Sequence, residues 1–265
     1  MVPPRAKGGR AVSLPLLRIE NVSKRFGGFT ALDSVSVEIA PGERFGLIGP
    51  NGSGKTTLIN CITGAFQPSS GRIIFAGQDV SQLPAHKRTR RGIARSFQIP
   101  RPFKSMTVIE NLMVAFDFAG RGRSKAQSDT PNLFPPNLHK DVRDEMSVIL
   151  DRMGLLAKAH VNAGQLSQVE LRKMELARAM AARPTLLISD EAMAGLSSSE
   201  VDEVLDLLLM LCADGITIIM IEHIMHAVMR FSTRVMCLDA GKIAALGAPK
   251  DVMANARVQE AYLGS

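Results

Sequence analysis

The sequence lacks any long hydrophobic run. Its predominantly apolar segments are short, and one such as residues 216–221 has the length of a buried strand. A membrane-spanning helix needs roughly 18 apolar residues. The N-terminal segment contains proline, glycine and basic residues but lacks the apolar core of a secretory signal, so residues 1–15 are expected to form a disordered tail. An integral membrane protein or a secreted protein is therefore not expected.

Cysteine is scarce as well. The chain has three cysteines, Cys61, Cys212 and Cys237, which are far apart and lie in apolar contexts. An odd number with this spacing argues against a disulfide framework or a zinc site. We expect buried thiols in a reducing, cytoplasmic compartment.

Acidic residues are outnumbered by basic ones, and the net charge is +7. Much of the excess lies in residues 87–91, followed by Arg95, Arg101 and Lys104. Two interpretations stay open: a solvated helix face, or a surface close to anionic lipid headgroups. Nucleic acid is not expected as a partner, because the basic stretch has no interleaved aromatic residues and matches no DNA-reading motif.

The apolar patterning predicts one α/β domain. Segments rich in Val, Ile or Phe and bounded by Gly or Pro predict strands early in the chain, at residues 16–21, 35–39, 44–48 and 72–75. A helical region follows over residues 83–163, with a polar, proline-rich interruption at 120–137 that we expect to be a mobile surface loop. Beyond residue 165, helices alternate with compact apolar runs typical of strands covered on both faces, at residues 186–189, 216–221 and 235–238.

The strongest motif is a glycine-rich loop between a predicted strand and a predicted helix over residues 54–64. Such a loop cradles phosphate, because its glycines let backbone N–H groups approach the oxygens and the helix N-terminus adds partial positive charge. Lys55 would reach the β- and γ-phosphates and Thr56 would bind Mg²⁺. The predicted nucleotide-binding residues are Gly49, Pro50, Asn51, Gly52, Ser53, Gly54, Lys55, Thr56 and Thr57.

Two acids end an apolar strand much later in the chain. Asp190 and Glu191 come 135 residues after Lys55 (190 − 55), and the carboxyl end of a parallel strand is where such sheets bind ligands. Asp190 is expected to hold Mg²⁺. Glu191 is expected to orient or deprotonate the attacking water, a role worth about 10²–10⁴ in rate.

With this order and spacing, the sequence resembles the ABC ATPase family. The resemblance implies that Phe26 stacks on adenine, that Gln98 touches Mg²⁺ and senses a permease, that residues 194–197 form the D-loop, and that His223 contacts the γ-phosphate. It implies a P-loop NTPase fold over residues 16–265, with a mainly parallel core sheet, an N-terminal antiparallel β subdomain and a helical subdomain at about 83–183. It further implies an ATPase that works with ATP and Mg²⁺ on the cytoplasmic face of a membrane, bound to permease subunits.

Softer signals resemble one subfamily, the ATPases of branched-chain amino acid importers. They are the segments at residues 96–98, 106–112 and 260–264. The resemblance implies a subunit that powers uptake of branched-chain or other hydrophobic amino acids.

The family's signature loop departs from its usual form here. It reads Leu166-Ser167-Gln168-Val169-Glu170, whereas the family keeps a glycine at the fourth position. A β-branched residue disfavours positive φ and adds bulk, and Glu170 brings negative charge. Ser167 is still expected to contact ATP held by a partner, but we expect a weak site there. A heterodimer with a second ABC ATPase would keep one sound site.

Two alternatives follow from the same residues. The altered signature also suits an ATP-binding regulatory subunit with little hydrolysis, although Glu191 and His223 argue against it. An ABC ATPase of repair or translation usually has two cassettes, and this chain has one. Smaller departures are Ser189, where an apolar residue is usual and a hydroxyl needs a backbone acceptor, and Ala192, which loosens the turn after Glu191.

Overall fold

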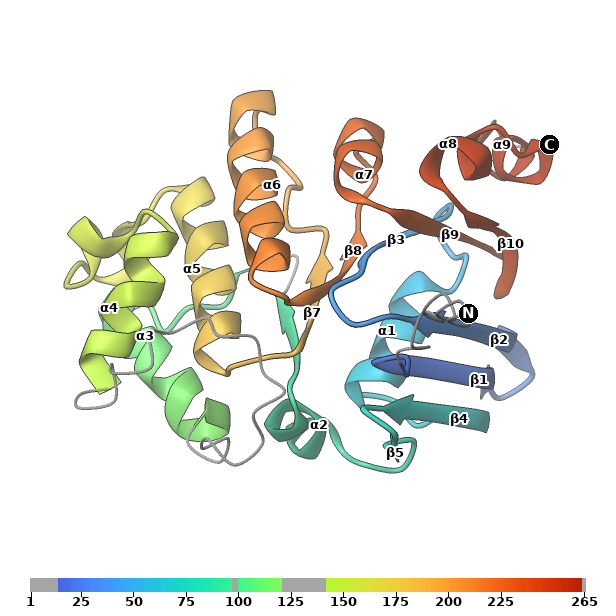
Figure 1. The fold of residues 1–265 in the computed structure, drawn as a ribbon, viewed down its shortest axis with the longest axis horizontal. Coiled ribbons are helices and arrows are strands. Elements are labelled where there is room, and N and C mark those ends of the chain that lie inside the picture. The colour runs from blue at the N-terminus through green and yellow to red at the C-terminus, as the bar shows by residue number, and fades with distance from the viewer. Residues whose placement is uncertain (1–13, 97–99, 121–141, 264–265) are drawn as a thin grey trace, which may run out of the picture.

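The computed structural model describes residues 14–96, 100–120 and 142–263. They form a six-stranded sheet, a four-stranded sheet and a helical lobe (Figure 1). The disordered tail predicted for residues 1–15 falls almost wholly outside the described residues, as does most of the predicted loop at 120–137.

The six-stranded sheet has the order β10-β9-β3-β8-β7-β6. Its neighbours from β9 to β6 pair in parallel, and β10 is added antiparallel at the edge. This arrangement confirms the predicted α/β class with a mainly parallel core. The strands are β3 (Arg44–Ile48), β6 (Ile93–Ser96), β7 (Leu186–Asp190), β8 (Thr217–Ile221), β9 (Arg234–Asp239) and β10 (Lys242–Gly247).

The four-stranded sheet is antiparallel, in the order β2-β1-β4-β5. It is the predicted N-terminal β subdomain, but its first two strands are longer than their apolar cores suggested, because polar residues on the exposed face continue the pairing. Its strands are β1 (Leu17–Phe26), β2 (Phe29–Ile39), β4 (Ser70–Phe75) and β5 (Gln78–Asp79).

Both faces of the parallel sheet are covered, so the central parts of its strands are mainly apolar. On β7, Ile188 packs with the antiparallel sheet and helix α1 (Lys55–Thr63), while Leu187 points the other way. On that second face lie α5 (Gln168–Ala181) and α6 (Ser198–Ala213). In Figure 1, α1 lies between the two sheets, whereas α6 and α7 (Met225–Phe231) stand above the core.

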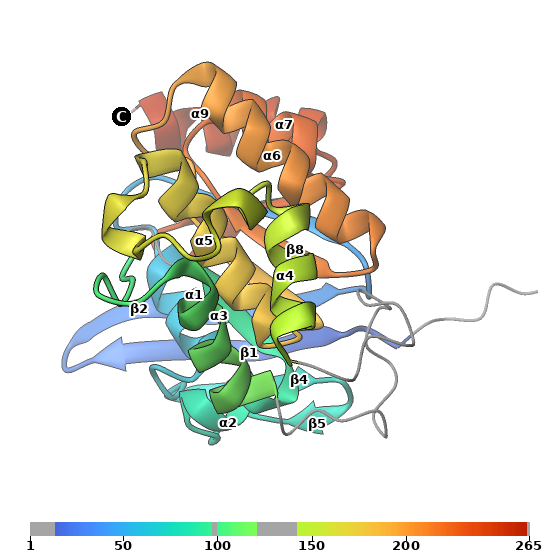
Figure 2. The same ribbon diagram turned by 90° about the vertical axis from the view of Figure 1, so that its left-hand side faces the viewer.

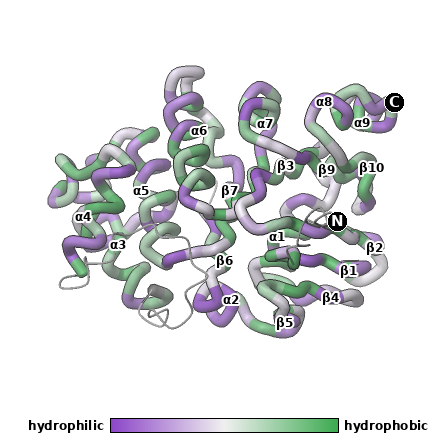
Figure 3. The backbone as a smooth tube through the Cα atoms, viewed as in Figure 1, coloured by the Kyte–Doolittle hydropathy of each residue, from purple (hydrophilic) through white to green (hydrophobic). Residues whose placement is uncertain are grey.

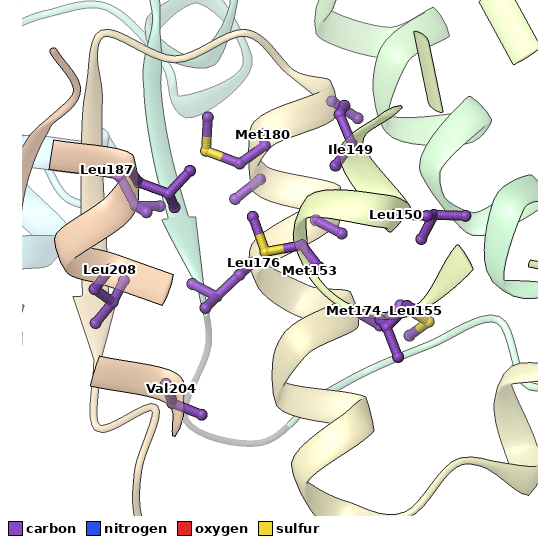
Figure 4. Packing of buried hydrophobic residues seen from close by; sticks show 14 of the residues in the cluster. Ile149, Leu150, Met153, Leu155, Met174, Leu176, Met180, Leu187, Val204 and Leu208 are labelled. Atoms are coloured by element: carbon purple, nitrogen blue, oxygen red, sulfur yellow. The ribbon is translucent and has the colours of Figure 1, made fainter. Parts of the chain in front are cut away.

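The helical lobe packs around α5, as Figure 2 shows from the side. It consists of α3 (Val108–Ala115), the π-helix η1 (Phe116–Gly120), α4 (Val142–Arg152) and the short 3₁₀ turns η2 (Leu156–Lys158) and η3 (Ala163–Gln165). Figure 4 shows its apolar side chains from α4 and α5 meeting those of β7 and α6. The lobe and the core therefore share one continuous apolar interior.

The range 83–183, predicted as a helical subdomain, includes one strand of the core sheet. Strand β6 pairs in parallel with β7, so the chain enters the core between α2 (Ala85–Arg91) and the helical lobe. The short apolar run at 93–94 hid this strand, because it is followed at once by Arg95 and Ser96.

The basic stretch does not form a single solvated face. Figure 3 shows α2 as a hydrophilic segment, and Lys87, Arg90 and Arg91 are exposed. Arg88 is fully buried and donates hydrogen bonds to four backbone carbonyls, two of them Cys61 and Ile62 at the end of α1. It therefore caps the C-terminus of α1, where a cation suits the helix dipole.

The remaining helices are α8 (Pro249–Met253) and α9 (Ala256–Leu263). Within the described ranges, no helix has the length and apolarity to cross a bilayer. The three cysteines are unpaired thiols. Cys61 and Cys237 are buried and Cys212 is half-buried, and burial raises the pKa of the Cys212 thiol to about 12. The predicted buried thiols are thus confirmed for Cys61 and Cys237.

Candidate nucleotide-binding site

The glycine-rich loop joins β3 to α1, as predicted. Gly54 caps the helix with φ 104°, and a Cβ there would lie 2.7 Å from the carbonyl oxygen of Ala31. Glycine is thus required both by conformation and by space. Gly49, at the start of the loop, is held by α9: its N–H donates to the Tyr262 hydroxyl at 2.8 Å.

Lys55 lies inside the loop. Its ammonium donates to the carbonyls of Gly49 at 2.7 Å and Pro50 at 2.9 Å. Burial lowers the pKa of Lys55, while the nearby Glu191 and Asp190 act in the opposite direction. The ammonium is therefore held by neutral oxygens at the position from which it can turn to an incoming phosphate.

The carboxyl end of β7 places both predicted acids beside the loop. Asp190 and Glu191 line a cavity of about 780 Å³ together with Thr56 of α1. Glu191 has a left-handed backbone with φ 46°, and its N–H donates to the Ile221 carbonyl of β8 at 2.9 Å. Non-glycine residues rarely adopt this conformation, and those that do are often found in turns at functional sites.

His223, which is predicted to contact the γ-phosphate, follows β8 and contacts Glu191. His223 Nε2 lies 2.9 Å from Glu191 Oε1, and the two side chains are 42% and 23% exposed. The structure thus brings the two predicted catalytic residues into direct contact, although they are 32 positions apart in the chain.

Asp190 has a cationic neighbour. Arg95 of β6 donates through Nε and Nη2 to Asp190 Oδ2, at 3.2 and 2.5 Å, and through Nη1 to Asn60 Oδ1 of α1 at 2.8 Å. The Arg95 and Asp190 side chains are 15% and 13% exposed, so solvent screens this pair only weakly.

Glu222, next to His223, is also buried. It accepts the Met193 N–H at 3.0 Å, just before the predicted D-loop, and Arg172 of α5 donates to the Ala194 carbonyl at 3.2 Å. Burial raises the pKa of Glu222 to about 7. These contacts thus connect α5, the predicted D-loop and the segment that carries His223.

The predicted adenine platform lies at the end of β1. Phe26 is 43% exposed and packs edge-on against Phe66, with ring centroids 5.4 Å apart. The Lys24 ammonium lies 5.0 Å from the centre of the Phe26 ring. Phe66 follows α1 closely in the chain, so the pair ties β1 to the end of the phosphate-loop helix.

At the signature, the side chains turn toward their own helix. Ser167 is the N-cap of α5 and forms a capping box with Glu170: the Ser167 N–H donates to Glu170 Oε2 at 2.9 Å. Glu170 also pairs with Lys158 at 2.5 Å, and these contacts lower the pKa of its carboxyl. The negative charge expected to face a partner's phosphate is therefore largely neutralised within the chain.

Val169 corrects a second expectation. It lies in the first turn of α5 with ordinary negative φ, so its β-branched side chain causes no backbone strain. The side chain is half-buried and packs against the apolar interior of the helical lobe. Of the two effects predicted for Val169, backbone strain is therefore absent. The added bulk of the side chain remains, at a position where the family has glycine.

The two smaller departures differ in outcome. Ser189 is fully buried, and its hydroxyl has no hydrogen-bond partner among the described residues, so the expected backbone acceptor is missing. Ala192 is 3% exposed and packs into the turn after Glu191, and the Ala194 N–H closes that turn by donating to the Glu191 carbonyl at 3.3 Å.

Gln98 lies outside the described residues, so its predicted contacts stay a prediction. The structure places the phosphate loop, Asp190, Glu191 and His223 at the carboxyl ends of β3, β7 and β8 in the six-stranded sheet. Phe26 lies at the end of β1 in the other sheet, and Ser167 lies at the start of α5. The loop residues Asn51, Gly52 and Thr56 are exposed and Ser53 is buried, its hydroxyl without a partner within the described ranges.

Comparison with known proteins identifies this architecture. A family model described as ABC transporter matches residues 32–194. The chain belongs to the ABC transporter family. It is therefore an ABC-type ATPase, as the order of its motifs predicted.

The relatives of this ABC ATPase match it over nearly their full length. The high-affinity branched-chain amino acid transport ATP-binding protein BraF of Pseudomonas aeruginosa is 36% identical over 258 residues, covering 96% of this chain and 99% of the relative. The corresponding LivG protein of Escherichia coli strain K12 is 38% identical over 255 residues, with coverage of 96% and 99%.

Solved structures agree. A nucleotide-free ATP-binding cassette from an ABC transporter superposes with a TM-score of 0.81 at 33% identity, covering 95% of this chain and 100% of the other. The ADP conformation of an ATP-binding cassette gives 0.82 at 33% identity, with the same coverage. The predicted P-loop NTPase fold is confirmed.

Sequence reasoning gave no role to Arg95, Asn60 or Glu222. The sequence placed Arg95 only in the basic stretch. The signal that could have identified it is its place: a cation in a short apolar run, paired in register beside the strand that ends in Asp190. Glu222 likewise comes directly after β8, a strand of isoleucine, methionine and threonine.

Proposed function

We propose that this ABC ATPase powers an importer of branched-chain or related hydrophobic amino acids, at the cytoplasmic face of a membrane. The observation that carries the proposal is the shared cavity edge where Thr56, Asp190 and Glu191 meet, with His223 bonded to Glu191. The substrate class rests on relatives that are named for branched-chain amino acid transport and match nearly the whole chain.

The residues at this edge suit Mg²⁺ bound with ATP. Thr56 offers a hydroxyl and Asp190 a carboxylate, the hard oxygen ligands that Mg²⁺ takes together with phosphate oxygens. Gln98 is the third proposed ligand. Magnesium held there would neutralise charge on the phosphates during phosphoryl transfer.

Glu191 is the proposed general base. Its carboxylate is held between the left-handed turn on one side and His223 on the other, which fixes it relative to the end of the loop. A carboxylate in this place can orient a water and accept its proton. His223 steadies Glu191 through their direct contact and is proposed to contact the γ-phosphate when ATP is bound. Lys55 supplies the cation for the β- and γ-phosphates.

A heterodimer suits the unequal quality of the chain's two surfaces. The phosphate-loop side has its full set of side chains, whereas the signature side presents Ser167 already bonded to Glu170 and carries Val169 in place of glycine. We therefore propose that the productive ATP site combines this chain's phosphate loop with the signature of a different ABC ATPase.

The same cavity suggests how the site communicates with a permease. From Thr56 and Asp190 it extends to the helical lobe, where it is lined by Phe103, Val114 and Phe118. These three apolar side chains are 46%, 37% and 55% exposed. A cytoplasmic segment of a permease seated there would contact the lobe and lie next to the acids that sense nucleotide.

The decisive test is ATP turnover by the chain alone, and then in mixtures with candidate partner ATPases and permeases. We expect appreciable turnover only in a mixture, abolished by Glu191→Gln on this chain. Uptake of leucine into vesicles containing the same complex tests the substrate class. Tight ATP binding without turnover in every mixture would contradict the proposal and indicate a regulatory subunit.

A further inference from the structure

Two elements that carry proposed metal ligands, α1 with Thr56 and β7 with Asp190, are joined through one arginine on a third element, β6. Strand β6 holds Arg95, whose guanidinium contacts Asp190 at the end of β7 and Asn60 on α1. Asn60 lies one helical turn after Thr56, and Gln98 follows Arg95 by three positions in the chain. Arg95 is thus placed to fix the position of Asp190 relative to the helix that carries Thr56.

The geometry of the contact leaves Asp190 able to act as a ligand. Arg95 Nε and Nη2 both donate to Oδ2, and among the described residues no hydrogen bond is made to Oδ1. The carboxylate is therefore oriented through one oxygen, and Asp190 lines the same cavity as Thr56. A guanidinium that merely occupied the site of the metal would be expected to take both oxygens.

The contacts also require an arginine in particular. Its planar fork delivers Nε and Nη2 to one acceptor while Nη1 reaches another on a different element. A lysine ammonium is a single point donor and cannot hold Asn60 and Asp190 at fixed geometry together. Because the Arg95 and Asp190 side chains are largely buried, their contact is shielded from competing water.

We propose that Arg95 is a positioning residue of the Mg²⁺ site, which orients Asp190 and locks it to the helix that carries Thr56. The inference rests on the proposed function, since it presumes that Asp190 and Thr56 bind the metal. Partners of metal-ligating carboxylates contribute about 10–100-fold to metal affinity in comparable sites.

The experiment measures metal binding without turnover. Mn²⁺ is titrated into the protein saturated with the non-hydrolysable analogue AMP-PNP, and free Mn²⁺ is followed by electron paramagnetic resonance. Affinity for AMP-PNP in EDTA is measured on the same samples. We expect Arg95→Gln to weaken Mn²⁺ binding by about 10–100-fold while leaving metal-free AMP-PNP affinity unchanged.

Two further variants sharpen the result. Arg95→Lys keeps the charge but loses the fork, so we expect Mn²⁺ affinity between that of the wild type and Arg95→Gln. Arg91→Gln removes an exposed arginine from α2 and is the matched control for loss of charge; we expect it to change neither affinity. Wild-type affinity in Arg95→Lys would show that charge alone suffices and overturn the positioning role.

Equal or tighter Mn²⁺ binding in Arg95→Gln would also overturn the proposal, because Arg95 would then compete with the metal. If Arg95→Gln lost metal-free AMP-PNP binding as well, Asn60→Ala would decide: it leaves Arg95 on Asp190 but removes the tie to α1. A smaller weakening of Mn²⁺ binding is expected, and no change would contradict the inference. Failure of the wild type to bind Mn²⁺ would instead contradict the proposed metal site itself.

Discussion

The phosphate-loop end and the signature end of this ATPase use their charged residues in opposite ways. At the phosphate-loop end, Asp190 and Glu191 line an open cavity and their partners hold them there. At the signature end, Glu170 is bonded to Ser167 and Lys158 of its own chain. The same kind of side chain therefore lines the proposed ATP site at one end and caps a helix at the other.

The difference teaches that an altered motif need not disturb the fold around it. Val169 and Glu170 fit α5 well, one through apolar contacts and the other through the capping box. Both residues are accommodated within the fold of this chain, so we expect any cost to fall on the proposed contacts with a partner's nucleotide. The four predictions below test this contrast.

The largest effect is expected at the phosphate-loop end. In an active mixture with a partner ATPase, Glu191→Gln should lower turnover by about 10²–10⁴, because the proposed general base is lost, while ATP binding is retained. Steady-state phosphate release measures it. Glu200→Gln is the matched control: Glu200 forms a capping box with Ser197 at the start of α6, and such a box accepts either residue at that position. A similar loss in the control would contradict the assignment.

At the signature end, the expected change is a gain. Val169→Gly in the chain assayed alone should raise turnover by up to about 10²-fold, if side-chain bulk is what weakens a site closed by this signature. The substitution should also lower stability by about 0.5–1 kcal/mol, since glycine costs helix conformational entropy. Val169→Ala separates loss of bulk from backbone freedom. Unchanged turnover in both variants would contradict the prediction that the bulk of Val169 weakens the site.

Glu222 lies where the two ends meet, and its effect should depend on pH. Its folded-state pKa is raised from 4.5 to about 7 by burial, so the folded protein favours the protonated form. Stability is therefore lost as pH rises from about 4.5 to 7, on the order of 3 kcal/mol at about 1.4 kcal/mol per unit.

Glu222→Gln removes this titration but keeps an acceptor for the Met193 N–H. We expect the variant's advantage in unfolding free energy to be small at pH 5 and larger at pH 8, as measured by urea denaturation. The same advantage at both pH values would show that Glu222 does not titrate in this range.

The smallest effect is expected at Ser189, inside the strand that ends in Asp190. Its buried hydroxyl has no partner among the described residues, so Ser189→Ala should raise the unfolding free energy by about 1 kcal/mol. Ser96→Ala is the matched control, because Ser96 on the neighbouring strand donates to the Ile188 carbonyl at 3.4 Å. It should give no gain. Equal gains would indicate that small apolar residues are simply preferred in these strands.

The sequence by itself determined the family, the fold class and the phosphate-loop chemistry. These depend on local requirements: glycines with positive φ at the loop, apolar strands covered on both faces, and acids at a strand's carboxyl end. Gly54, Lys55 and Asp190 lie where those requirements place them. Local rules could be applied without knowing which distant segments meet.

Tertiary structure decided the rest, because it depends on side chains that meet across long stretches of chain. Sequence order gave no sign that Arg95 would hold Asp190 to Asn60, that Tyr262 would accept a hydrogen bond from Gly49, or that Arg88 would be buried. It also misjudged Val169 and Glu170, whose surroundings are set by the helical lobe. Packing of β6 beside β7 and of α5 against the core fixed these contacts.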